Sequence, residues 1–150
     1  MSLTEKISSD LITAMKAKDK VALEAIRAAK TAFILAHSEK GADAVLSAED
    51  ELKIIQKLVK QRRESAAIFK ENNRQDLYEK EVAEADVLEK YLPAKMSEAE
   101  LEKVLMDIIS RVGAKFPADI GKVMGAATKE LAGKADGKEI SARVKALLGN

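Results

Sequence analysis

The residues of this sequence best suited to bind a ligand are lysines and glycines near its C-terminal end. They recur at short intervals as Lys122, Lys129, Lys134, Lys138, Lys145, Gly121, Gly125, Gly133 and Gly137. Lysine side chains neutralise phosphate, and backbone amides can approach a phosphate closely where glycine carries no side chain. From Val112 onward basic residues outnumber acidic ones, although the net charge of the whole chain is only +1. The pattern predicts a local phosphate-binding edge.

The same residues also have a purely structural interpretation. Gly121 and Gly125 would allow two helices to pack closely, and outward-facing lysines need no ligand. No aromatic residue lies between Gly121 and Leu148 to stack on bases, which favours recognition of a folded RNA backbone over recognition of a single strand. The spacing alone leaves both interpretations open.

Three charged residues fall inside the apolar arcs of predicted helices: Lys30, Arg62 and Glu81. This placement follows from an advance of about 100° per residue along a helix. The residues are expected to form ion pairs, with Arg62 and Glu81 as one pair, because a buried charge without a partner costs on the order of 3–5 kcal/mol. The alternative is a docking seam for a partner protein.

The sequence offers few residues for catalysis. It has one histidine and no cysteine, and it lacks the glycine-rich loop that holds nucleotide phosphates in P-loop proteins. The histidine, His37, falls near the predicted end of a helix, close to the negative end of the dipole, and a purely structural role is expected for it. We therefore expect no catalytic residue, no metal site, no cofactor and no standalone enzymatic activity.

The composition is that of an all-α protein. The 150 residues are 47% hydrophobic, 34% charged and only 3% aromatic, with two prolines. Alanine, leucine, glutamate and lysine dominate, and these residues favour helices over sheets. The absence of cysteine excludes disulfides, and the N-terminal residues lack the apolar run of a signal peptide or a membrane span. We expect a cytoplasmic protein with no membrane contact.

Apolar residues at intervals of three and four predict seven helices in two domains. Pro93 must end the fourth helix, because proline disfavours helix in the residue before it. The predicted domains are a four-helix N-terminal domain of residues 1–92 and a small three-helix tail domain of residues 93–150. The helix start signals are Ser2, Asp19, Ser47, Ser97 with Glu100, and Asp136, and the fourth helix is predicted to begin at about Gln75.

Four segments together resemble the GatB/YqeY family, specifically its free-standing YqeY branch. They are KQRRESAAIFKENNRQDLYEKEVAE at 60–84, YLPAKMSEAEL at 91–101, GKVMG at 121–125 and GKADGKEISARVKALL at 133–148. The resemblance implies a helical N-terminal domain and a tail similar to that of GatB, a component of the glutamyl/aspartyl-tRNA amidotransferase. In that enzyme the tail is associated with tRNA binding, and the catalytic domains, which this chain lacks, carry out glutamine hydrolysis and transamidation. Similar tail appendages occur on some glutaminyl-tRNA synthetases.

The family's tail signature matches Gly121, Lys122, Met124, Gly125, Gly133, Lys134, Ala135, Asp136 and Gly137. The chain departs from the family pattern at Ala127 or Thr128, where a bulky apolar residue is common. The resemblance implies a non-catalytic accessory protein that binds tRNA. Any carbon–nitrogen ligase activity with glutamine as amido donor would belong to the full-length enzyme. The alternative is an adaptor that docks on an aminoacyl-tRNA synthetase or an amidotransferase.

Overall fold

The computed structural model describes residues 1–149, and they confirm the predicted all-α class. They contain seven α-helices and a short 3-10 helix, and no strand is found among them. The described chain divides into two compact units, one of residues Met1–Leu92 and one that starts at Pro93. Each unit has its own cluster of buried apolar side chains.

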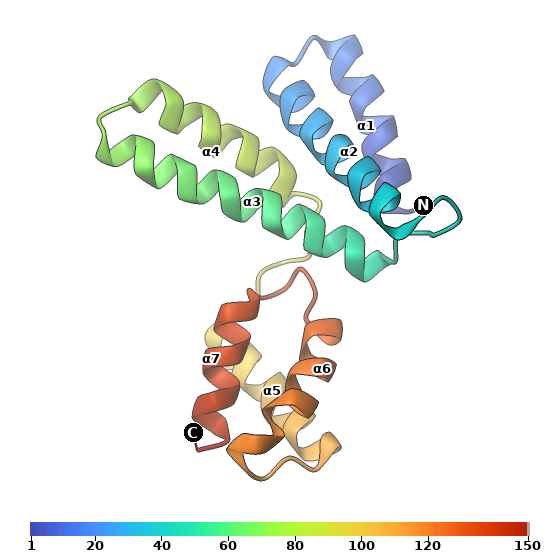
Figure 1. Ribbon diagram of the computed structural model, residues 1–150. Helices are drawn as coiled ribbons and strands as arrows, with labels where there is room; N and C mark the ends of the chain where they lie inside the picture. The colour runs from blue at the N-terminus through green and yellow to red at the C-terminus, as the bar shows by residue number, and fades with distance from the viewer. Residues whose placement is uncertain (150) are drawn as a thin grey trace. The chain divides into compact units, whose positions relative to one another are not determined.

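The first unit consists of two antiparallel helical hairpins (Figure 1). Its helices are α1 (Leu3–Ala17), α2 (Lys20–Lys40), α3 (Ala48–Glu71) and α4 (Gln75–Glu89). The buried residues of its core come mainly from α1, α2 and α3, and they are joined by a leucine of α4: Ile7, Ala14, Ala25, Ile26, Ala29, Phe33, Ile55, Val59 and Leu88.

Capping residues explain where these helices begin. Ser2 and Ser47 each open a capping box, in which the serine hydroxyl accepts the backbone N–H three residues later and the acidic side chain there accepts the serine N–H. Asp19 caps α2 by accepting the N–H of Ala22 at 3.1 Å. The start signals predicted at these three positions are confirmed.

Two sets of hydrogen bonds tie distant segments of the first unit together. The N-terminal turn of α1 is bonded to α3, since the backbone N–H and the hydroxyl of Thr4 donate to Glu51 Oε2 at 2.6 and 2.7 Å. The Tyr91 hydroxyl donates to Asp10 Oδ2 at 2.6 Å. These bonds provide the buried Glu51 carboxylate with two donors, and they join α1 to α3 and to the segment that follows α4.

The fourth helix is shorter than predicted. It ends at Glu89, and the next residues form tight turns in which Tyr91 N–H donates to Leu88 and Leu92 N–H to Glu89. Proline at position 93 disfavours helix at Leu92, and the chain leaves the helix a few residues before it reaches that limit. Leu92 still packs against the core of the first unit.

The second unit contains α5 (Glu98–Val112), the 3-10 helix η1 (Pro117–Asp119), α6 (Ile120–Glu130) and α7 (Gly137–Leu147). The capping box predicted at Ser97 and Glu100 is present. The sequence pattern did not predict η1, which places proline in its first turn, where a missing N–H costs nothing. Helices α6 and α7 run antiparallel and are joined by a short turn (Figure 1).

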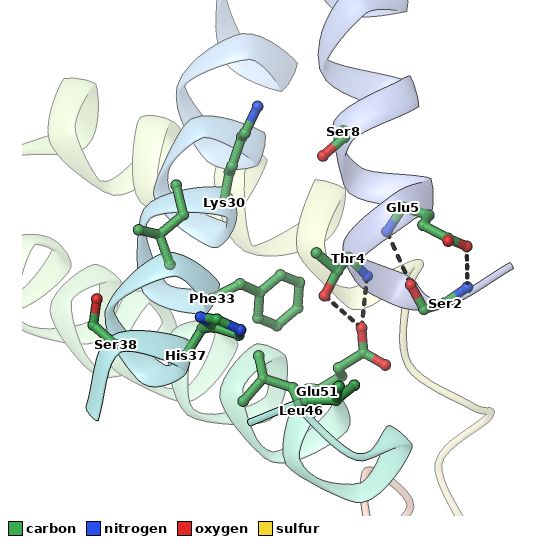
Figure 2. A pocket seen from close by; sticks show the side chains of 12 residues that line it. Ser2, Thr4, Glu5, Ser8, Lys30, Phe33, His37, Ser38, Leu46 and Glu51 are labelled. Atoms are coloured by element: carbon green, nitrogen blue, oxygen red, sulfur yellow. Dashed lines mark hydrogen bonds between the residues drawn. The ribbon is translucent and has the colours of Figure 1, made fainter. Parts of the chain in front are cut away.

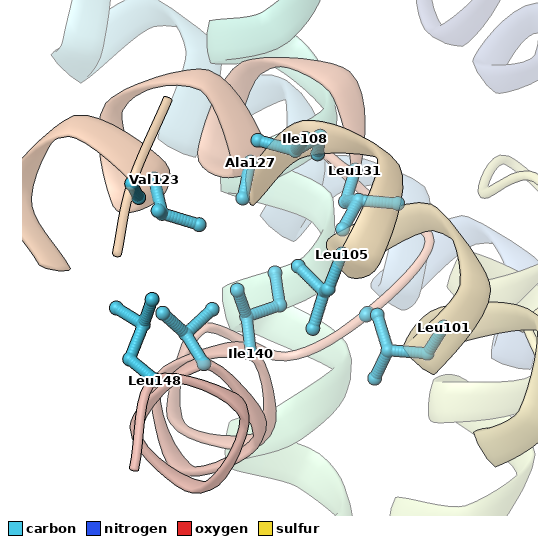
Figure 3. Close-up of a cluster of buried hydrophobic side chains, with 11 residues drawn as sticks. Leu101, Leu105, Ile108, Val123, Ala127, Leu131, Ile140 and Leu148 are labelled. Atoms are coloured by element: carbon cyan, nitrogen blue, oxygen red, sulfur yellow. The ribbon is translucent and has the colours of Figure 1, made fainter. Parts of the chain in front are cut away.

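The core of the second unit is small and fully enclosed. Leu101, Leu105 and Ile108 of α5 pack with residues of α6 and α7 around a common centre (Figure 3). Ala127, one of the two residues at which the resemblance implies a bulkier side chain, is fully buried in this core. The neighbouring Thr128 donates its hydroxyl to the Met124 carbonyl at 2.8 Å, so its polar group is satisfied within α6.

Candidate nucleic-acid interface

The five lysines of the predicted edge are all exposed on α6, on α7 and in the turn between them. Lys122 and Lys129 stand on α6, Lys134 lies in the turn, and Lys138 and Lys145 stand on α7. The two lysines of each helix are seven residues apart, which places them on the same side of that helix about 10 Å apart along its axis. Because α6 and α7 are antiparallel, Lys129, Lys134 and Lys138 lie near the turn, whereas Lys122 and Lys145 lie towards the opposite ends.

Three of the four glycines in this region expose open backbone. Gly121, Gly125 and Gly137 are exposed or partly exposed, and a Cβ atom added to any of them would meet no neighbouring atom within 4 Å. Close packing against another helix within the described chain therefore does not explain why glycine occupies these positions. A ligand could approach the backbone there without displacing a side chain.

Gly133 has a different role from the other three glycines. It adopts the left-handed conformation with φ of 75°, two residues beyond Leu131, which caps the C-terminal end of α6. It is buried, so its own backbone is not open to a phosphate. The structure therefore corrects the grouping of Gly133 with the contact residues: it shapes the turn that presents Lys134.

The arginines of the second unit are paired with acids, whereas the five lysines are not. Arg111 binds both oxygens of Glu130 at 2.8 Å and also Asp107 at 2.9 Å, and Arg143 lies 3.0 Å from Glu98. Within residues 1–149, no ion pair engages the ammonium group of Lys122, Lys129, Lys134, Lys138 or Lys145. These cations are available to an external anion.

Asp119 closes the turn that precedes α6. Its Oδ2 accepts the backbone N–H groups of Lys115 at 2.9 Å and Phe116 at 3.2 Å. These two hydrogen bonds, with a smaller contribution from the charge of Lys122, lower the pKa of the Asp119 carboxyl. The carboxylate is thus committed to closing the turn before α6.

Phe116 is a surface residue that the sequence pattern did not single out. Its side chain is 65% exposed, and it lies directly ahead of η1 and α6. An exposed aromatic ring beside lysines is suited to stacking on a nucleotide base. It lies five residues before Gly121, just outside the glycine- and lysine-rich stretch that has no aromatic residue of its own.

Lys30, Arg62 and Glu81, the charged residues predicted inside apolar arcs, do not form one site. Arg62 Nε lies 3.5 Å from Glu84 Oε2, and the two side chains are 16% and 9% exposed. The predicted pairing of Arg62 with Glu81 was wrong, because Glu84 is the more deeply buried of two acids that lie three residues apart on the same side of α4. Lys30 lies elsewhere, at a cavity of the first unit.

Glu84 has an unusual electrostatic environment. Burial and the neighbouring carboxylate of Glu24 raise its pKa, and the charge of Arg62 offsets only part of this effect. The pKa of Glu24 is lowered, chiefly by its interaction with Glu84 and also by Lys80. The pair therefore favours a state in which a proton resides on Glu84.

The raised pKa of Glu84 predicts a specific pH dependence of stability. Between its ordinary pKa of 4.5 and the higher folded value, the folded state binds more protons than the unfolded state, so the free energy of unfolding gains a contribution as the pH falls. Replacing Glu84 with glutamine should remove this contribution. Urea unfolding at pH 5 and pH 7 measures this effect. The free energy of unfolding should rise less between pH 7 and pH 5 in Glu84→Gln than in the wild type.

The exposed Glu79 of the same helix provides the matched control. The Glu79→Gln variant should retain the wild-type dependence of the free energy of unfolding on pH. Identical pH dependence in Glu84→Gln and the wild type would contradict the assignment.

Comparison with known proteins assigns the chain to a family. The family described as Yqey-like protein matches residues 4–148. The chain belongs to the YqeY-like family. The match includes both compact units, the five lysines and the four glycines of the candidate interface.

A curated relative of this YqeY-like chain comes from Pyrenophora tritici-repentis (strain Pt-1C-BFP). It is named altered inheritance of mitochondria protein 41, mitochondrial, and it is 29% identical over 148 residues. The aligned region covers 96% of this chain and 80% of that protein. The similarity therefore extends through both units.

Two further features of the YqeY-like chain bear on function. Among the described residues, no helix combines the length and the apolarity that a membrane crossing requires. The first unit contains a cavity of about 430 Å³ between α1, α2 and the segment that leads into α3. The sequence pattern did not predict this cavity, because its walls come from three separate segments.

Proposed function

We propose that this YqeY-like protein is an accessory protein that binds tRNA through α6, α7 and the turn between them, and that it has no catalytic activity alone. We further propose that the two compact units are its domains, a four-helix N-terminal domain of residues 1–92 and a small tail domain of residues 93–150. The resemblance of the tail to that of the amidotransferase component GatB supports tRNA as the ligand.

The observation that carries this proposal is the set of five exposed lysines without acidic partners beside open glycine backbone. Ammonium groups neutralise phosphates, and exposed amides near the start of a helix add hydrogen bonds and a favourable dipole. Gly137 and Lys138 lie in the first turn of α7, and Gly121 and Lys122 in the first turn of α6. These groups provide charge and hydrogen-bond donors, which fits recognition of a folded RNA backbone.

Titration of labelled tRNA at several salt concentrations tests the proposal. Each neutralised phosphate contributes roughly −0.7 to −0.9 to the slope of log K against log salt, so contacts from all five lysines predict a slope of roughly −3.5 to −4.5. An unstructured single-stranded RNA of the same length is the control and should bind more weakly. A slope near zero, or no binding at about 0.1 M salt, where such contacts are still strong, would refute the proposal.

The alternative function is that of an adaptor that docks on an aminoacyl-tRNA synthetase or an amidotransferase. The exposed apolar side chains of Met106 and Phe116 on the second unit favour it. A stable complex between the purified chain and a purified enzyme of either class, formed in the absence of RNA, would support this alternative.

We propose a cytoplasmic location, whereas the fungal relative is described by its name as mitochondrial. The location of a fluorescent fusion of this protein would distinguish a cytoplasmic from a mitochondrial protein.

A further inference from the structure

The cavity of the first unit contains polar groups of two kinds. Its lining includes two acids, Glu5 and Glu51, and both are engaged within the protein. Glu5 Oε2 accepts the backbone N–H of Ser2 at 2.9 Å, and Glu51 Oε2 accepts both donors of Thr4. Figure 2 shows these bonds clustered at one end of the cavity. The acids therefore have structural roles at the start of α1.

The remaining polar side chains of the cavity are donors without partners. In the described part of the chain, no hydrogen bond or ion pair engages the side chains of Ser8, Lys30, His37 or Ser38. Lys30 is half-buried, and its side chain extends towards the end of the cavity at which Ser8 lies, away from Glu51 (Figure 2). Because no side chain of the described residues pairs with it, the Lys30 ammonium group at the cavity wall is available to an anion.

Apolar side chains form the middle of the cavity. Phe33 and Ile34 lie between Lys30 and His37 on one side of α2, because positions i, i+3, i+4 and i+7 share a helix face. Val45 and Leu46, from the segment before α3, add a second apolar wall. Ile34 is 58% exposed, so an apolar ligand would remove a large side chain from water. Known small-molecule sites have volumes of about 300–1,000 Å³, and this cavity falls within that range.

We propose that this cavity binds a small organic acid. Its carboxylate pairs with the Lys30 ammonium and lies near the Ser8 hydroxyl, and its apolar body covers Phe33 and Ile34. The unpaired donors select an acceptor, and the placement of Glu51 at the opposite end fixes the orientation of the anion. This site lies in the first unit and is independent of the proposed tRNA interface.

A pair of probes that differ only in charge tests the proposal. Naphthalene-2-carboxylate and the neutral naphthalene-2-carboxamide would be titrated into the isotope-labelled full chain and followed by amide NMR shifts. Both probes should shift residues 30–38 and 45–46, and the carboxylate should bind about tenfold more tightly, the ratio typical of one partly buried charge-assisted hydrogen bond. The Lys30→Met variant should remove this preference and leave the affinity for the neutral carboxamide probe unchanged.

Two further variants serve as controls. Lys20→Met, on the exposed start of the same helix, should retain the tenfold preference. Ile34→Asn should weaken the binding of both probes equally, because it removes part of the apolar wall and leaves the charge of Lys30 in place. Equal binding of the two probes to the wild type, a preference that persists in Lys30→Met, or shifts confined to residues 120–147 would overturn the proposal.

Discussion

Replacing Lys122, Lys134 and Lys138 together by glutamate is expected to weaken tRNA binding roughly a hundredfold or more at about 0.1 M salt. Each lost phosphate contact lowers log K by about 0.7 to 0.9 at that salt concentration, and the introduced carboxylates add repulsion. The slope of log K against log salt should become shallower by roughly 2 to 3. Labelled-tRNA titrations at several salt concentrations measure both quantities.

The control for this variant carries the same change of net charge in the first unit. Lys16, Lys20 and Lys57 are exposed lysines there, and their replacement by glutamate should change tRNA affinity far less. Undiminished binding after the triple substitution in the second unit would show that the interface is misplaced. An equal loss in the control would show that overall charge, not a local site, governs binding.

Replacing Leu105 by alanine is expected to unfold the second unit. Leu105 is fully buried at the centre of its core. Removing such a leucine costs about 2–5 kcal/mol, whereas a unit of this size gains only about 3–5 kcal/mol from its core. Hydrogen exchange measured by mass spectrometry should show loss of protection across α5, α6 and α7, with α1 to α4 still protected.

The neighbouring Met106 provides the control for Leu105. Its side chain is 56% exposed, so Met106→Ala should change the stability of the second unit by no more than about 0.5 kcal/mol. Retained protection of the second unit in Leu105→Ala would contradict the expected marginal stability. Simultaneous loss of protection in the first unit would show that the two units fold as one.

Helix starts were predictable because their signals are local. At Ser2, Ser47 and Ser97 a serine precedes an acid by three residues, and the two side chains satisfy backbone N–H groups that the first turn leaves free. The left-handed residue at Gly133 was predictable for a similar reason, since glycine adopts a positive φ without steric cost. No knowledge of distant residues was needed at these positions.

Features that depend on packing between distant segments were not predictable in the same way. Glu81 and Glu84 lie on the same side of α4, and only the position of α3 determines that Arg62 pairs with Glu84. The burial of Gly133 depends on how the second unit packs around the turn. The cavity around Lys30 requires α1, α2 and the segment before α3 to come together, although the sequence did place Lys30 inside the apolar arc of its helix.

A single backbone hydrogen bond joins the turn between α6 and α7 to the segment that precedes α5 in the second unit. The carbonyl of Lys134 accepts the N–H of Met96 at 3.4 Å, and Met96 lies three residues after Pro93. A ligand that immobilises the backbone of the turn at Lys134 therefore also restrains the segment of the second unit that precedes α5. Occupancy of the lysine-bearing turn should therefore slow the exchange of the Met96 amide proton.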